Sequence, residues 1–176
     1  MKKLVCLMML ALISITASAA TVSLHADQTV FVPGEIITIS VISTGNCTNI
    51  AIPEIISTAG GIASNFFLNP GFNQFPQAGT MVNAGNVLIT GVSGATPFAF
   101  PPVPVVAGTA LYSFDFTLPY VDIWSPLTIS GAGNLSFMFD DFSQVTELGS
   151  VTFFIIPEPI TIALLGLGGL FLRRRK

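Results

Sequence analysis

The stretch Ile36-Ile-Thr-Ile-Ser-Val-Ile-Ser43 is rich in β-branched residues and alternates apolar and polar side chains at its centre. Ile37, Ile39 and Val41 would share one face of a strand, because successive side chains of a strand point to opposite faces. Leu111-Tyr-Ser-Phe-Asp-Phe-Thr117 has the same period, with aromatic rings at alternate positions. Both stretches predict strands with one buried and one solvated face, which is typical of an antiparallel sheet.

Outward from these two stretches, short β-branched or aromatic runs recur between turn residues, and no stretch keeps a helical apolar period. Further strands are predicted at 21–25, 50–57, 86–92, 126–130, 134–140 and 149–156. About eight or nine strands joined in this way favour an all-β fold, a single two-sheet sandwich that is most simply jelly-roll-like.

The charged residues are few and unevenly placed. Only 9% of the 176 residues are charged, and all six cations lie at the two ends of the chain: Lys2, Lys3, Arg173, Arg174, Arg175 and Lys176. Phosphate neutralisation needs clustered Lys and Arg, so this distribution excludes a nucleic-acid partner.

The N-terminus has the three regions of a secretory signal peptide. Lys2 and Lys3 precede an apolar run over 4–15, and small residues follow at 16–20. Ala17 and Ala19 fit a signal-peptidase site, which predicts cleavage after Ala19 and export by the Sec route. A membrane-anchoring helix is the alternative, but twelve apolar residues cover only about 18 Å of a ~30 Å bilayer core.

The C-terminus has three elements in order. Pro157, Glu158 and Pro159 precede an apolar run over 160–172, and Arg173, Arg174 and Arg175 with a final lysine close the chain. The run predicts a short transmembrane helix whose basic end stays cytoplasmic. We therefore expect a signal peptide at 1–19, a β-sandwich ectodomain at 20–156 and a tail at 157–176.

This tail resembles the PEP-CTERM sorting signal, and it is also similar to a segment named for the C-terminus of ice-binding proteins. The resemblance implies an exosortase, a membrane cysteine transpeptidase, as partner, with the six residues at 157–159 and 173–175 as the sorting motif. It further implies an inner-membrane anchor, then the cell surface or an extracellular matrix containing exopolysaccharide. A simple C-terminal membrane anchor is the alternative interpretation.

A second resemblance covers about residues 20–120. Val22-Ser-Leu-His-Ala-Asp27, Phe31-Val-Pro-Gly-Glu35 and Gly108-Thr-Ala-Leu-Tyr-Ser-Phe-Asp-Phe-Thr117 look like strands of a cohesin-like domain. The resemblance implies a protein-recognition module with a dockerin partner.

Catalytic and metal-binding patterns are sparse. The one histidine, His25, lacks a serine in a nucleophile elbow, and zinc needs more His and Cys ligands than this chain offers. Cys47 is the one cysteine left after signal removal, and it is either a buried thiol or an intermolecular link. Asp140 and Asp141 are either solvated turn residues or part of a calcium site. We expect no enzyme activity and no cofactor, with Ca²⁺ as the open alternative.

Aromatic residues mixed with amides offer the one pattern for glycan binding. Residues 65–76 carry four phenylalanines among Asn and Gln side chains, with Phe72 and Phe75 as candidate contacts. Tyr120 and Trp124 are two further candidates. The alternative is that the Phe rings fill the core beneath a loop.

Together these patterns predict an exported, non-enzymatic surface or matrix protein. We expect a structural or adhesive component associated with exopolysaccharide. The alternative is a carbohydrate-binding or cohesin-like recognition module.

Overall fold

The two stretches that alternate most clearly in the sequence pair with each other at the centre of one sheet. The computed structural model describes residues 19–32, 34–99, 101–117 and 126–155. In it β3 (Ile36–Ser43) and β8 (Ala110–Thr117) run antiparallel, with Ile39 opposite Phe114. The predicted inner faces of both strands are buried, as expected for rows of apolar side chains that leave water.

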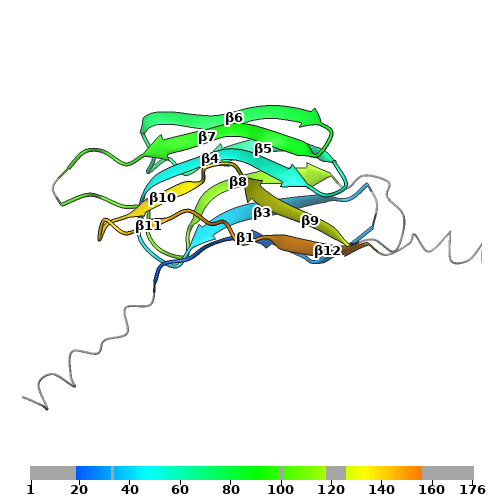
Figure 1. Ribbon diagram of the computed structural model, residues 1–176, viewed down its shortest axis with the longest axis horizontal. Coiled ribbons are helices and arrows are strands. Elements are labelled where there is room, and N and C mark those ends of the chain that lie inside the picture. The colour runs from blue at the N-terminus through cyan, green and yellow to red at the C-terminus, as the bar shows by residue number, and fades with distance from the viewer. Residues whose placement is uncertain (1–18, 33, 100, 118–125, 156–176) are drawn as a thin grey trace, which may run out of the picture.

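The strands form two sheets packed face to face (Figure 1), which confirms the expected all-β sandwich. The small sheet has the order β1-β3-β8-β5, where β1 spans Val22–Ala26 and β5 spans Ile62–Leu68. The large sheet contains β2 (Val30–Phe31), β4 (Cys47–Ser57), β6 (Gln74–Ala84), β7 (Val87–Ala95), β9 (Leu127–Ala132), β10 (Ser136–Phe139), β11 (Gln144–Val145) and β12 (Val151–Ile155).

Strand β4 organises the large sheet. It pairs with β7 along one side, and β7 pairs in turn with β6 at the sheet edge. Along its other side, β4 pairs with β10 through its first half and with β9 through its second half. Asn49 consequently lies between Ala95 of β7 and Met138 of β10, at the end of the sheet where β4 begins.

The core fills the space between the sheets and is closed along both sides. Ile50, Ile52 and Phe137 of the large sheet are completely buried. On one side, Leu24 N–H donates to Gly149 O, and Gly149 N–H donates to the carbonyl of residue 22, both at 2.9 Å. On the other side, Ala63 N–H donates to Asn83 Oδ1 at 3.1 Å. Hydrogen bonds therefore link the sheets where their edges meet.

Four described strands were not predicted from the sequence: the two-residue strands β2 and β11, and the longer strands β5 and β6. The end of β5 and the start of β6 fall within residues 65–76, for which the sequence predicted either glycan contacts or Phe rings that fill the core beneath a loop. The twelve described strands exceed the eight or nine expected. The pairing of β5 and that of β6 both contain register shifts. Asn65 in β5 (φ 50) and Asn83 in β6 (φ 46) have positive φ. Such bulges break the two-residue period on which strand prediction depends.

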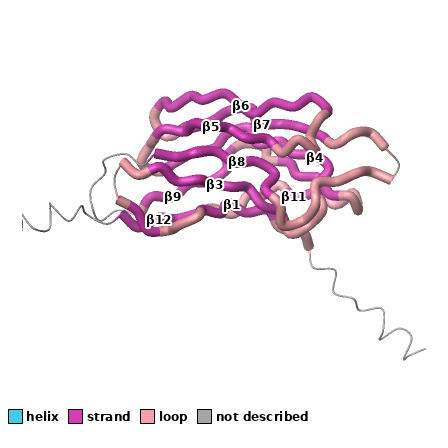
Figure 2. Tube along the Cα trace, turned by 180° about the vertical axis from the view of Figure 1, so that it is seen from behind, coloured by secondary structure: helices cyan, strands magenta, loops and turns pink. Residues whose placement is uncertain are grey.

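The two ends of the described chain lie at opposite ends of the sandwich (Figure 1). The tube view from behind shows the same arrangement, with β12 and β9 at one end and the long loop after β7 at the other (Figure 2). Within the described ranges, no helix is long and apolar enough to cross a membrane. The expected tail helix and the first eighteen residues of the expected signal peptide lie outside those ranges.

Candidate functional site

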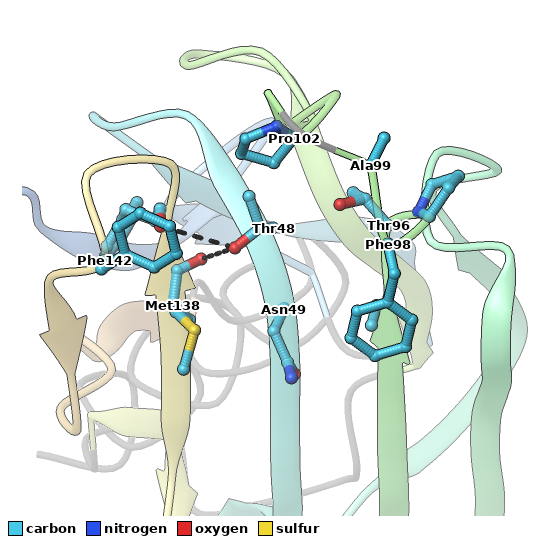
Figure 3. A pocket seen from close by; sticks show the side chains of 11 residues that line it. Thr48, Asn49, Thr96, Phe98, Ala99, Pro102, Met138 and Phe142 are labelled. Carbon is cyan, nitrogen blue, oxygen red and sulfur yellow. Dashed lines mark hydrogen bonds between the residues drawn. The ribbon is translucent and has the colours of Figure 1, made fainter.

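A groove opens at the end of the large sheet where β4 begins and β7 ends. Figure 3 shows Thr48 and Asn49 on β4 as its floor, with Met138 and Phe142 on one side and Phe98 on the other. The groove encloses about 210 Å³. The rings of Phe98 and Phe142 are 90% and 72% exposed, whereas Phe139, which also lines the groove, is buried.

The loop that carries Phe98 is anchored to β4 at both ends. Thr96 N–H donates to Thr48 O at 2.9 Å, which fixes the start of the loop. Further along, Cys47 and Val105 exchange two backbone hydrogen bonds of 2.9 and 2.8 Å. Both ends of the loop are therefore hydrogen-bonded to the start of β4. These bonds position Phe98 at the side of the groove.

Phe142 is positioned by a tight hairpin between β10 and β11. Phe142 N–H donates to Phe139 O, and Phe139 N–H donates to Ser143 O, both at 3.0 Å. Phe142 has φ 62, a left-handed conformation in which glycine usually closes such hairpins. A bulky residue pays a steric cost there. The backbone is therefore strained at Phe142, the residue whose ring is exposed to solvent at the tip of the hairpin.

Two carboxylates stabilise this hairpin instead of entering the groove. Asp141 accepts hydrogen bonds from the Ser143 hydroxyl and from Ser143 N–H, the latter at 2.9 Å, and these bonds lower the pKa of Asp141. Asp140 accepts a 2.9 Å bond from Asn46 Nδ2. Asn46 Oδ1 also accepts from Ala107 N–H at 3.1 Å, so one amide joins the hairpin to the loop after β7.

The groove itself is uncharged. None of the described residues that line the groove carries a charge. The polar side-chain groups that line it are the Asn49 amide and the threonine hydroxyls. The Thr48 hydroxyl already donates to Met138 O at 3.1 Å. Aromatic walls around an amide floor suit a neutral ligand with apolar faces.

The outer face of the large sheet continues this neutral surface. The register aligns Gln77, Ser93, Ala51 and Ser136 in one cross-strand row over four neighbouring strands. Ser93 Oγ donates to Gln77 Oε1 at 3.4 Å within that row. A ligand seated in the groove would therefore lie against small, uncharged side chains along the sheet.

Cys47 is the first residue of β4, next to the groove residue Thr48, and it is buried, as one of the two sequence interpretations proposed. Desolvation raises the pKa of its thiol to about 12. A thiol with so high a pKa is protonated at neutral pH and is a poor nucleophile. Its role in this structure is that of a small core side chain.

His25 lies on the exposed face of β1, where its Nε2 is 2.9 Å from Ser23 Oγ. No carboxylate among the described residues hydrogen-bonds to the ring, and the pair lies on an open strand, not in a described cavity. Within the described ranges, no three His, Cys, Asp or Glu side chains gather as a metal site. Asp140 and Asp141 hydrogen-bond within their own hairpin.

The predicted glycan contacts are separated by the fold. Phe72 is 1% exposed and belongs to the core, the second role that the sequence allowed, whereas Phe75 on β6 is 80% exposed. Tyr120, Trp124 and the sorting-motif residues lie outside the described ranges. Sequence reasoning missed the groove, although an Asp-Asp-Phe-Ser hairpin with phenylalanine in the glycine position is a signal that could have drawn attention to Phe142.

Comparisons with known proteins found similarity for two parts of the chain, the C-terminal tail and the sandwich. Residues 156–176 match the family model of the PEP-CTERM protein-sorting motif, so the chain carries this motif at its C-terminus. No curated protein sequence matches the chain. The two-sheet sandwich is similar in structure to cohesin modules, which confirms the second resemblance at the level of the fold.

The similar structures are distant in sequence. The sixth cohesin of Acetivibrio cellulolyticus scaffoldin B, solved with a Cel5 dockerin mutant, has a TM-score of 0.55 at 12% identity, covering 80% of this chain and 100% of the cohesin. The second type II cohesin of its ScaA scaffoldin gives 0.54 at 15%, covering 80% and 95%. CaCohA2 from Clostridium acetobutylicum gives 0.55 at 10%, covering 77% and 91%.

Proposed function

We propose that this protein is a non-enzymatic recognition module displayed at the cell surface. In this proposal residues 1–19 direct export through signal peptidase, residues 20–156 form the module, and residues 157–176 are the substrate of an exosortase. The matched sorting motif supports a membrane-processed surface protein. The cohesin-like sandwich supports a module that binds a protein partner.

The observation that carries the proposal is the position of the groove. The groove, flanked by Phe98 and Phe142, lies at one end of the sandwich (Figure 1). Strand β12 finishes at the opposite end, and the sorting motif follows it in the chain. A module held through its C-terminal tail would thus present the groove away from the membrane. The ligand we propose is a neutral, apolar segment of a surface protein. This module would bind that segment as a cohesin binds a dockerin.

A second candidate ligand is a neutral polysaccharide of the surrounding matrix. The observation that favours it is the Asn49 amide between two exposed aromatic rings, because rings stack on sugar faces while amides bond to hydroxyls. Polyanionic chains do not fit, since residues 4–172 contain carboxylates but no Lys or Arg. In this form the protein would be an adhesive component of the exopolysaccharide.

The test is binding of the purified full-length chain to envelope fragments from producing cells. We expect the double variant Phe98→Ala/Phe142→Ala to bind about tenfold more weakly, and Phe75→Ala, which removes an exposed ring that does not line the groove, to bind normally. Protease treatment of the fragments should abolish binding to a protein, and periodate should abolish binding to a glycan. Equal effects of Phe75 and the groove residues would contradict the proposal.

A further inference from the structure

The sandwich ends where the sorting motif begins. Strand β12 ends at Ile155, the matched motif starts at residue 156, and the apolar run of the tail starts at Ile160. Four residues between them span about 17 Å at most when fully extended. The polar headgroup layer of a bilayer is itself about 5–8 Å thick on each side. When Ile160 enters the hydrocarbon layer, this end of the sandwich must lie at the membrane surface.

Exposed apolar side chains surround that same end. On the large sheet, Phe154 pairs with Val30, and both side chains are exposed. On the small sheet, Ile36 and Ile62 flank Thr117 on neighbouring strands, and both are exposed. With exposed Val32 they form what we call the collar: Val30, Val32, Ile36, Ile62 and Phe154.

The charges near the collar point to a neutral surface. Glu35 accepts hydrogen bonds from Gln28 Nε2 at 2.7 Å and from Val32 N–H at 3.3 Å, so a carboxylate lies beside the collar. No Lys or Arg occurs between residues 4 and 172 to attract anionic headgroups. Contact with a bilayer at this end would therefore rest on apolar side chains and would be weakened by anionic lipid.

We propose that the collar docks on the lipid surface while the tail spans the bilayer, before the sorting enzyme cuts it. In the docked state, the end of the sandwich where β12 finishes contacts the membrane. The groove, at the opposite end, faces away from the membrane (Figure 1). The proposal goes beyond ligand recognition at the groove, and it rests on the membrane insertion of the matched tail.

Depth-dependent quenching tests this contact. The full-length chain, with Cys6 and Cys47 replaced by alanine, carries one fluorescent label on either Ile36→Cys or Val103→Cys, the latter an exposed position in the loop at the opposite end. Each is reconstituted into phosphatidylcholine vesicles with or without brominated acyl chains. We expect at least twofold quenching of the label at 36 and none at 103. Equal signals at both positions, or failure of the chain to float with the vesicles, would overturn the proposal.

A second variant separates the collar from simple tethering. The double variant Ile62→Thr/Phe154→Thr places a β-branched strand former at each of these two exposed positions, so the sandwich should fold normally. In this background the quenching at position 36 should fall about twofold. Adding anionic lipid to vesicles that hold the labelled chain with Ile62 and Phe154 intact should also reduce the quenching. Unchanged quenching in both cases would show that the collar makes no lipid contact. Groove binding is measured separately, so its failure leaves this result intact.

Discussion

The phenol of Tyr112, buried on the small sheet, donates a 2.8 Å hydrogen bond to the backbone carbonyl of Ala78 on β6 of the large sheet. This bond crosses from one sheet to the exposed edge strand of the other. Burial also raises the pKa of Tyr112, which keeps the donor proton in place well above neutral pH.

Replacing Tyr112 by phenylalanine should destabilise the protein by about 1–3 kcal/mol, because the Ala78 carbonyl loses its donor beneath the edge of the sheet. Urea unfolding at neutral pH measures the loss. As a control, Thr152→Val removes a hydroxyl from the exposed Thr128–Thr152 pair and should cost less than about 0.5 kcal/mol. Similar losses in the two variants would show that the sheet-to-sheet bond contributes little.

The buried thiol of Cys47 should make the protein sensitive to alkaline pH. Its folded pKa of about 12 exceeds that of an unfolded thiol, about 8.5, so the folded state holds the proton longer. The resulting stability is fully present below about pH 8.5 and is lost towards pH 12, at up to ~1.4 kcal/mol per pH unit. Urea titrations from about pH 7 to 10 should show a shallower decline for Cys47→Ala. Parallel curves for the two proteins would refute this linkage.

Phe142→Gly should stabilise the fold and weaken ligand binding. Glycine adopts φ 62 without the steric clash that the Cβ of phenylalanine causes, so we expect a gain of about 0.5–1 kcal/mol. Phe142→Ala removes the same ring but keeps a Cβ in the strained conformation, and should give no such gain. Thermal unfolding of both variants, with the envelope-binding assay, separates strain from recognition. A less stable glycine variant would mean that the ring packs productively.

Two glycines with positive φ should differ sharply in their tolerance of alanine. A Cβ at Gly61 (φ 127) would run into the buried ring of Phe116, whereas a Cβ at Gly85 (φ 63) meets nothing within 4 Å. We expect Gly61→Ala to cost about 3 kcal/mol or more and Gly85→Ala about 1 kcal/mol. Chemical denaturation of both variants gives the comparison. Equal costs would show that backbone strain, not the contact with Phe116, decides.

Replacing Pro157, Glu158 and Pro159 with alanines should leave export intact but retain a full-length species in the membrane. The apolar run and the terminal cations remain, so insertion should be unaffected. Intact-mass measurement of membrane and extracellular fractions distinguishes the two forms. Lys176 on released wild-type protein would overturn the sorting proposal.

Much of the sandwich was predictable because its central strands bury one face. Ile37, Ile39 and Val41 alternate since alternate side chains enter the core, and the same constraint acts on Tyr112 and Phe114. Edge strand β6 is mostly exposed and bulged, so burial imposes no period on its residues. Prediction therefore failed where packing does not constrain the residue choice.

The sorting motif can be recognised without a structure, because Pro157-Glu158-Pro159, an apolar run and a basic end follow one another along the chain. The buried faces of the central strands can be recognised in the same way from their two-residue period. The groove, in contrast, exists only in the folded chain, since the pairing of β4 with β7 and β10 brings Asn49, Phe98 and Phe142 to one site. Likewise, only the fold placed Phe72 in the core and Phe98 in solvent, because the sheet packing and not the residue type decides which ring loses water.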